Sequence, residues 1–159
     1  MDLRSAIVRG CGVGIMQSNI KSAFWEHFEH KADIGVRGVG ATMEQAFEQV
    51  AIALTAVITE PASVEPKEKV QIACEATDDE LLLIDWLSNL LFEMDCRKML
   101  FSRFEVAINH DKLTGVCWGE KINAARHQPA VEVKGATYML LSVKQNNDGK
   151  WIAQCVVDV

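Results

Sequence analysis

The stretch TMEQAFEQVAIALTAVITEP, residues 42–61, decides the fold of this chain. Its apolar residues recur at steps of three and four, which places them on one face of an amphipathic helix. They are Met43, Ala46, Phe47, Val50, Ala51, Leu54, Val57 and Ile58. The hydroxyl group of Thr42 can cap the backbone N–H of Gln45, whose amide can reach back as in a capping box. Pro61 ends the helix soon afterwards, so the segment predicts one helix lying on an apolar layer.

A second helix is predicted further along the chain. Thr77 and Glu80 have the spacing of another capping box, and an apolar stripe follows them. The stripe consists of Leu83, Trp86, Leu87, Leu90, Leu91 and Met94. Two amphipathic helices of this kind need a further apolar surface to cover.

Segments in which apolar and polar residues alternate surround the two helices and predict β-strands. These segments are 24–28, 34–39, 70–74, 104–108, 113–118, a long strand running from 131–133 into 138–143, and 151–157. Tight turns are predicted at 109–112 and 146–149. The order of elements predicts an α+β domain in two layers, with two main helices packed on one face of a mostly antiparallel sheet.

The length of 159 residues suits one domain, and 49% of the residues are hydrophobic, enough for a real core. Residues 1–22 contain Gly10, Gly12 and Gly14 without an amphipathic period, so we expect a flexible N-terminal extension followed by a domain at 23–159. The longest apolar run, 81–84, is far too short for a membrane span. Residues 1–22 are too polar for a secretory signal, so a cytoplasmic protein without membrane contact is expected.

The charge balance restricts the partners. The chain has 22 acidic and 16 basic residues and a net charge of −6, which disfavours direct, tight nucleic-acid binding. A protein partner or a cation is the better expectation. The five cysteines show no C-x-x-C spacing, which argues against a disulfide framework and against a thiolate zinc site.

Two aspartates are candidate cation ligands. Asp33 lies between two predicted strands, and Asp158 ends the last one, each beside apolar neighbours. Such a carboxylate must be solvated, paired or bound to a cation, because an unpaired buried charge is costly. The residues alone leave open whether both aspartates are simply exposed. A site at His27 and His30 is a weaker alternative, since a strand need not place both on one face.

Six collinear blocks resemble the archease family and together span about residues 25–159. The blocks are EHKADIG (29–35), TMEQAFEQVA (42–51), LLLIDWLSNLL (81–91), LFSRFEV (100–106), EVKGATY (132–138) and VDV (157–159). Any one block is weak, but six in the same order are specific.

The resemblance implies an α+β fold with a divalent metal, usually calcium, at one tip of an archease domain. By motif match, the ligands would be the carboxylates of Asp33 and Asp158 and the backbone carbonyl of Val159. Lys134 is similar to a residue that matters for activity in the family, and Glu44 on the first helix is a weaker candidate.

The chain departs from the family pattern at a few positions. Lys31 stands where threonine is usual, beside the expected metal ligand Asp33. Gly135 occupies a small position in the EVKGATY block, and Met139 follows where histidine is frequent. None of these departures removes an acidic ligand.

The resemblance also implies a function. Archeases are accessory factors of the GTP-dependent RNA ligase of tRNA splicing and RNA repair. The chain would therefore promote guanylylation of the ligase by GTP and its repeated turnover, without being an enzyme itself. Two alternatives stay open: a chaperone-like or modulatory interaction protein that acts without the ligase, and a small hydrolase that uses the aspartate pair and a metal-bound water. The sequence offers few ligands and no evident base for the hydrolase.

Overall fold

The computed structural model describes residues 9–11 and 23–159. The elements in chain order are β1 (Arg9–Cys11), β2 (Phe24–His30), β3 (Asp33–Gly40), α1 (Met43–Ile58), η3 (Pro61–Ser63), β4 (Glu68–Glu75), α2 (Asp79–Arg97), β5 (Met99–Asn109), β6 (Lys112–Lys121), α3 (Ala124–His127), β7 (Gly135–Ala136), β8 (Ser142–Gln145) and β9 (Trp151–Asp158). Of the predicted extension, residues 9–11 form β1, which pairs with β2. The rest of that prediction, at 1–8 and 12–22, lies outside the described residues.

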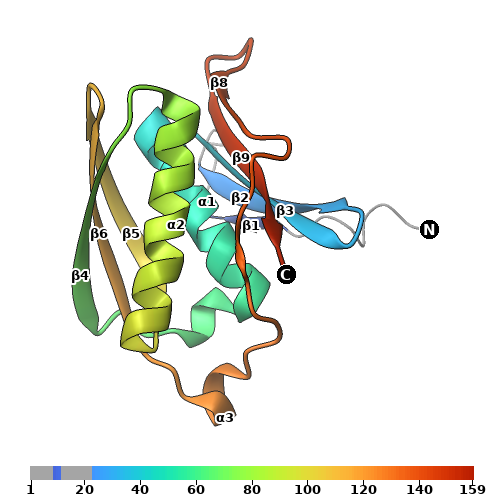
Figure 1. Ribbon diagram of the computed structural model, residues 1–159, viewed down its shortest axis with the longest axis vertical. Helices are drawn as coiled ribbons and strands as arrows, with labels where there is room; N and C mark the ends of the chain where they lie inside the picture. Colours follow the sequence, from blue (N-terminus) through green and yellow to red (C-terminus); the bar gives the residue numbers. More distant parts are fainter. Residues whose placement is uncertain (1–8, 12–22) are drawn as a thin grey trace.

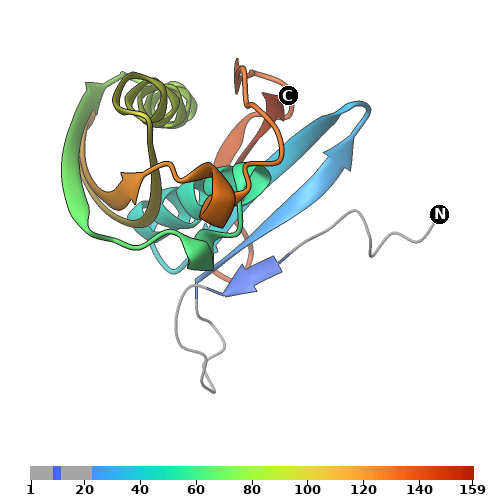
Figure 2. The ribbon, with the colours of Figure 1, turned by 90° about the horizontal axis from the view of Figure 1, so that it is seen from below.

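The described strands form two antiparallel sheets, and the predicted α+β class is confirmed. The larger sheet has the order β1-β2-β3-β9-β7, with β8 also paired to β9, and the smaller sheet has the order β4-β6-β5. Figures 1 and 2 show the sheets on either side of the long helices. Alternation within single strands predicts that they are strands, but it does not say how they divide between sheets.

Helix α1 lies between the two sheets and contacts β3 on one side and β5 on the other. Its predicted cap is confirmed, because the Gln45 N–H donates to the Thr42 hydroxyl at 3.1 Å. The Gln45 amide oxygen accepts from the N–H of Ala41 at 2.8 Å, which extends the cap by one residue. Phe47 is fully buried, and its carbonyl oxygen accepts a hydrogen bond from the indole N–H of Trp86 at 3.0 Å. This bond ties α1 to α2.

The predicted capping box of the second helix is wrong. The Asp78 carboxylate caps α2 instead, accepting from the N–H groups of Glu80 at 2.7 Å and Leu81 at 3.2 Å. A carboxylate is also favoured by the positive end of the helix dipole, so it replaces Thr77 as the cap.

The predicted long strand after residue 131 is also wrong. Within residues 131–145, two short strands, β7 and β8, pair with β9, and residues 137–141 between them form a turn. Val133 packs against the core from a segment that has no strand partner, while Val131 is 40% exposed. The alternating pattern of this segment therefore reflects packing of one side chain against α2 and the core, not pairing in a sheet.

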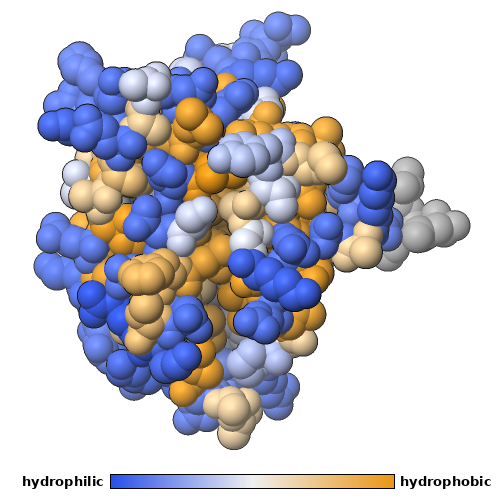
Figure 3. Space-filling view, in the orientation of Figure 1, coloured by the Kyte–Doolittle hydropathy of each residue, from blue (hydrophilic) through white to orange (hydrophobic). Residues whose placement is uncertain are grey.

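Among the described residues, no helix combines the length and the apolar character that a membrane crossing needs. Figure 3 shows hydrophobic atoms exposed along the middle of one face, with hydrophilic atoms on both sides.

The contact between β3 and α1 yields a stability prediction. A Cβ atom on Gly38 would lie 2.2 Å from the carbonyl oxygen of Ala46 and 2.3 Å from the backbone nitrogen of Val50. Since backbone atoms cannot step aside, Gly38→Ala should lower the free energy of unfolding by about 1–3 kcal/mol or more, measured by urea denaturation. Gly135→Ala is the control, because nothing lies within 4 Å of its added Cβ. Equal stabilities of the two variants would contradict the close contact.

Candidate metal centre

Strands β3 and β9 bring the predicted metal ligands to one end of the larger sheet. Their antiparallel register ends at the pair of Ile34 with Val157, and continuing it by one residue on each strand sets Asp33 against Asp158. Residues that face each other in this way have Cβ atoms about 4.5–5.5 Å apart. The backbone N–H of Val159 donates to Oδ1 of Asp33 at 3.3 Å. The three residues are thus neighbours, and we call this end of the sheet the acidic tip.

The acidic tip is accessible and electrostatically uncompensated. Asp33, Asp158 and Val159 are all half-buried. Among the described residues, no lysine or arginine forms an ion pair with either carboxylate. Two carboxylates on neighbouring strands repel each other, and a shared cation would remove that repulsion.

The donors at the acidic tip fit a hard cation in kind and fall short in number. Calcium takes six to eight oxygen ligands, and magnesium takes six in an octahedron. The chain offers two carboxylates here and the backbone carbonyl of Val159, with no cysteine beside them. In the described part of the chain, no three His, Cys, Asp or Glu side chains gather into a complete cation site. The remaining positions on an ion would therefore belong to water or to oxygen atoms of a partner.

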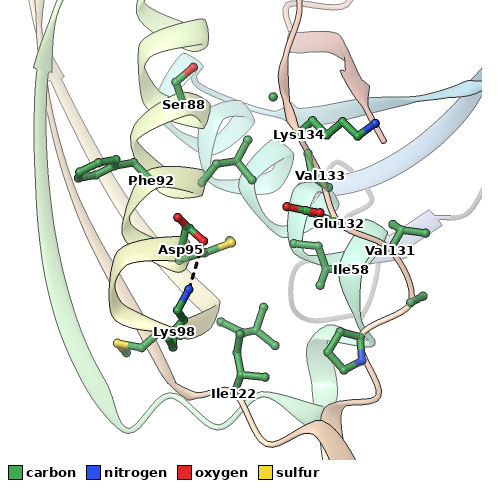
Figure 4. Close-up of a pocket in the computed structure, with 17 residues that line it drawn as sticks. Ile58, Ser88, Phe92, Asp95, Lys98, Ile122, Val131, Glu132, Val133 and Lys134 are labelled. Atoms are coloured by element: carbon green, nitrogen blue, oxygen red, sulfur yellow. Dashed lines mark hydrogen bonds and ion pairs between the residues drawn. The ribbon is translucent and has the colours of Figure 1, made fainter.

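Lys134 lies beside the acidic tip. Its backbone N–H donates to the carbonyl oxygen of Asp158 at 2.7 Å, and Gly135 pairs with Asp158 in the sheet. The Lys134 side chain is exposed, and Figure 4 shows it pointing away from α2. The structure therefore places an exposed lysine beside the acidic tip, where a partner can meet it.

Glu44 lies elsewhere. Helix α1 begins against the last residue of β3, since a Cβ on Gly40 would be 2.4 Å from Cβ of Gln45. The eight residues of β3 separate that end from Asp33 by roughly 23 Å at about 3.3 Å per residue. The structure does not bring Glu44 to the acidic tip, and its role in activation stays a prediction.

The two early histidines do not form a joint site. His27 is buried toward α1, with Nε2 2.8 Å from the carbonyl oxygen of Ala53, and burial lowers the pKa of its imidazole. His30 instead pairs with Asp33 across the turn at Lys31, so it lies next to the acidic tip. The patterns of the sequence did not predict that His30 is a neighbour of the tip. The two-residue connection between His30 and Asp33 was the signal that could have revealed it.

A buried charge cluster supports the segment that leads to Lys134. Glu120 is only 4% exposed, and its carboxylate accepts two hydrogen bonds from the guanidinium of Arg126, both at 2.8 Å. The N–H of Asn123 donates to Nδ1 of His127 at 2.9 Å, so Nε2 carries the proton and donates to Glu120 at 2.9 Å. The Arg126 guanidinium, with a further bond from the N–H of Glu65, holds the pKa of Glu120 well below its usual range. No sequence pattern pointed to this cluster.

The fold and the acidic tip define a small α+β domain with an open surface site built from oxygen donors. Residues 25–159 match the model of the Archease protein family (MTH1598/TM1083). The chain belongs to this family, which is one of accessory proteins.

Known relatives are similar over nearly their whole length. The chain is 42% identical to the protein archease of Pyrococcus furiosus over 139 residues, covering 85% of this chain and 98% of that one. It is 39% identical to the protein archease of Sulfurisphaera tokodaii over 137 residues, with the same coverage. The solution structure of protein 1598 of Methanobacterium thermoautotrophicum superposes with a TM-score of 0.75 at 34% identity, covering 85% of this chain and 98% of that chain. These matches confirm the resemblance and the fold.

The Glu120 cluster yields a pH-dependent prediction. Glu120→Gln should lower the thermal midpoint by several degrees at pH 7, because the ionised carboxylate is lost beside Arg126. The pKa of Glu120 is depressed in the folded state, so its contribution to stability is complete above the unfolded value of about 4.3 and declines as the pH falls from there toward the lower pKa of the folded carboxyl group. The difference in thermal midpoint between Glu120→Gln and the wild type should therefore become smaller below about pH 4. The exposed Glu68→Gln is the control, and a gap that is constant with pH would contradict the assignment.

Proposed function

We propose that this chain is a non-enzymatic, metal-binding activator of the GTP-dependent RNA ligase of tRNA splicing and RNA repair. In this proposal the acidic tip holds a divalent cation, with calcium as the expected ion, through Asp33, Asp158 and the carbonyl of Val159. The single observation that carries the proposal is the convergence of these residues, shown by the 3.3 Å contact between Asp33 and the Val159 N–H. Family membership supports the accessory role.

The acidic tip would act by placing charge where the ligase reacts with GTP. A bound cation would supply positive charge for phosphate oxygens, and Asp33 and Asp158 would hold it with positions left for those oxygens. Phosphoryl transfer depends mainly on positioning and on neutralising charge, so a transient helper can speed guanylylation without chemistry of its own. The ligase would supply the histidine that accepts the guanylate and its own metals, and would be left competent for repeated turnover.

The charge of the chain supports a protein partner. With a net charge of −6, the chain gains nothing from counterion release on RNA, so direct, tight nucleic-acid binding is not part of the proposal. An acidic surface is instead complementary to the electropositive cleft that a GTP- and RNA-binding ligase needs. We place this partnership in the cytoplasm and without a membrane.

One observation favours a second, chaperone-like function. A pocket of about 840 Å³ lies between α2 and residues 129–135, with apolar walls that include Leu91 and Val133. Figure 4 shows it together with Lys134 at its edge. Suppression of aggregation through this pocket would need neither ligase nor metal, so it would persist in the presence of a chelator.

Removing either carboxylate tests the metal proposal. Asp33→Asn and Asp158→Asn keep the side-chain shape but remove an anionic oxygen ligand. Each should weaken calcium binding, measured by isothermal titration calorimetry, by at least about tenfold, the size of a lost charge-assisted contact. Each should also abolish stimulation of ligase guanylylation, followed with labelled GTP.

Asp148→Asn is the matched control, because it makes the same charge change in the exposed turn before β9, at the other end of that strand. It should bind calcium and stimulate the ligase as the wild type does. Undiminished stimulation by Asp158→Asn would overturn the proposed function.

Lys134 should contribute to activation but not to metal binding. Lys134→Gln removes the exposed ammonium while keeping the backbone hydrogen bond to Asp158. Stimulation of guanylylation at saturating chain should fall several-fold, because a positive charge near the reacting phosphates is lost. Calcium affinity should stay within about twofold or rise slightly, since removing a nearby positive charge favours a cation. A large loss of calcium affinity would contradict this division of roles.

A further inference from the structure

Three consecutive large side chains lie exposed in the turn between β7 and β8. The exposed fractions are 69% for Tyr138, 49% for Met139 and 51% for Leu140. We call residues 138–140 the apolar turn. Single exposed apolar residues are ordinary on protein surfaces, but three in a row in one turn are not.

The apolar turn is held firmly by the sheet beneath it. Two hydrogen bonds form within the turn: the Met139 N–H donates to Oγ1 of Thr137 at 3.1 Å, and the Leu141 N–H donates to the Tyr138 carbonyl at 3.2 Å. Two more come from β9: the Val156 N–H donates to the Met139 carbonyl at 3.1 Å, and the Gln154 side-chain amide donates to the Leu140 carbonyl at 3.0 Å. A surface that is already ordered loses little conformational entropy on docking.

Leu140 adds a conflict between residue type and backbone. Its φ of +52° lies in the left-handed region, which glycine and asparagine adopt far more readily than leucine. The side chain is 51% exposed, so packing offsets only part of this cost. A strained residue whose side chain is half exposed is consistent with a use outside the folded chain.

The apolar turn lies along the edge of β9 that also pairs with β7, at the level of Val156 and Gln154. On this edge of β9, Gly135 lies opposite Asp158 and Ala136 lies opposite Val157. The next residue, Thr137, donates its N–H to the Val156 carbonyl at 3.0 Å. Asp158 and Val156 are two residues apart, about 7 Å along a strand. A partner that covers about 800 Å² centred on the acidic tip, the usual size of an interface, would also reach the apolar turn.

We propose that the apolar turn is the docking element of this chain for the ligase, received by an apolar recess at the edge of the cleft that the acidic tip enters. This inference rests on the proposed function and assigns the affinity for the partner to the turn, leaving activation to Asp33 and Asp158. Aromatic residues and methionine are enriched in protein interfaces and suit such a role. A second copy of this chain is the poorer occupant, because it would bring another acidic tip against the first.

The test compares binding with activation. Tyr138→Ser combined with Leu140→Asn removes two apolar side chains, and asparagine tolerates the left-handed backbone, so the thermal midpoint should not fall. Binding to the ligase of the same organism, measured by biolayer interferometry, should weaken at least about tenfold, as for loss of an interface anchor. Stimulation of guanylylation should return to the wild-type level when the variant is saturating.

The control is Phe92→Ser, an aromatic residue that is 61% exposed on α2 and that Figure 4 shows pointing away from residues 131–134. Its affinity for the ligase should stay within about twofold of the wild-type affinity, a much smaller change than the loss of an interface anchor causes. If the wild-type chain binds and stimulates the ligase and the Tyr138/Leu140 variant binds it with the same affinity, the docking role of the turn is overturned and the proposed function is not. A wild-type chain that neither binds nor stimulates the ligase would overturn the proposed function and this inference with it.

Discussion

The close approach of α1 to β3 is the constraint on which the rest of the structure depends. Gly38 and Gly40 leave no room for a side chain, so the backbones of helix and strand touch directly. That contact buries the apolar stripe of α1 against the larger sheet, while its other side meets β5 of the smaller one. Because β3 is fixed by the helix, its partner β9 has only one register that keeps Val36, Cys155 and Val157 buried. The acidic tip follows from that register, since a slip of one residue would turn Asp158 to the other face.

Elements with a repeating residue pattern could be predicted from the sequence, whereas features that depend on one side-chain contact could not. The periodic stripe of residues 43–58 gave the first helix and its Thr42 cap. One carboxylate, Asp78, displaced the predicted Thr77 cap, and alternation at 131–133 mimicked a strand that has no partner. Asp33 and Asp158 could be paired in advance only through family resemblance, because 126 positions separate Asp33 from Val159. No sequence pattern predicted the Glu120 cluster, because its members come from the end of β6, from the short helix α3 and from the chain around Glu65.

The chain treats its carboxylates in two opposite ways. Glu120 is buried and accepts hydrogen bonds from Arg126, His127 and a backbone N–H, so its negative charge is compensated inside the fold. Asp33 and Asp158 are half-buried, lie side by side and have no cationic partner among the described residues. The first arrangement stabilises one conformation of the chain between β6 and β7. The second leaves negative charge available at a surface, and a surface charge of this kind is useful only to something that arrives from outside.

Under the proposed function the chain must leave the ligase after each cycle, and the small apolar surface near the acidic tip is suited to that. Three apolar side chains form a small anchor, far below the area of a permanent interface. In this proposal the cation contact would weaken when the pyrophosphate leaves the cleft, because the negative charge that the cation neutralises leaves with it. Affinity from a small rigid anchor and activation from a charge contact that ends with the reaction together favour rapid release. A larger apolar contact would bind the ligase more tightly and would slow the exchange on which its turnover depends.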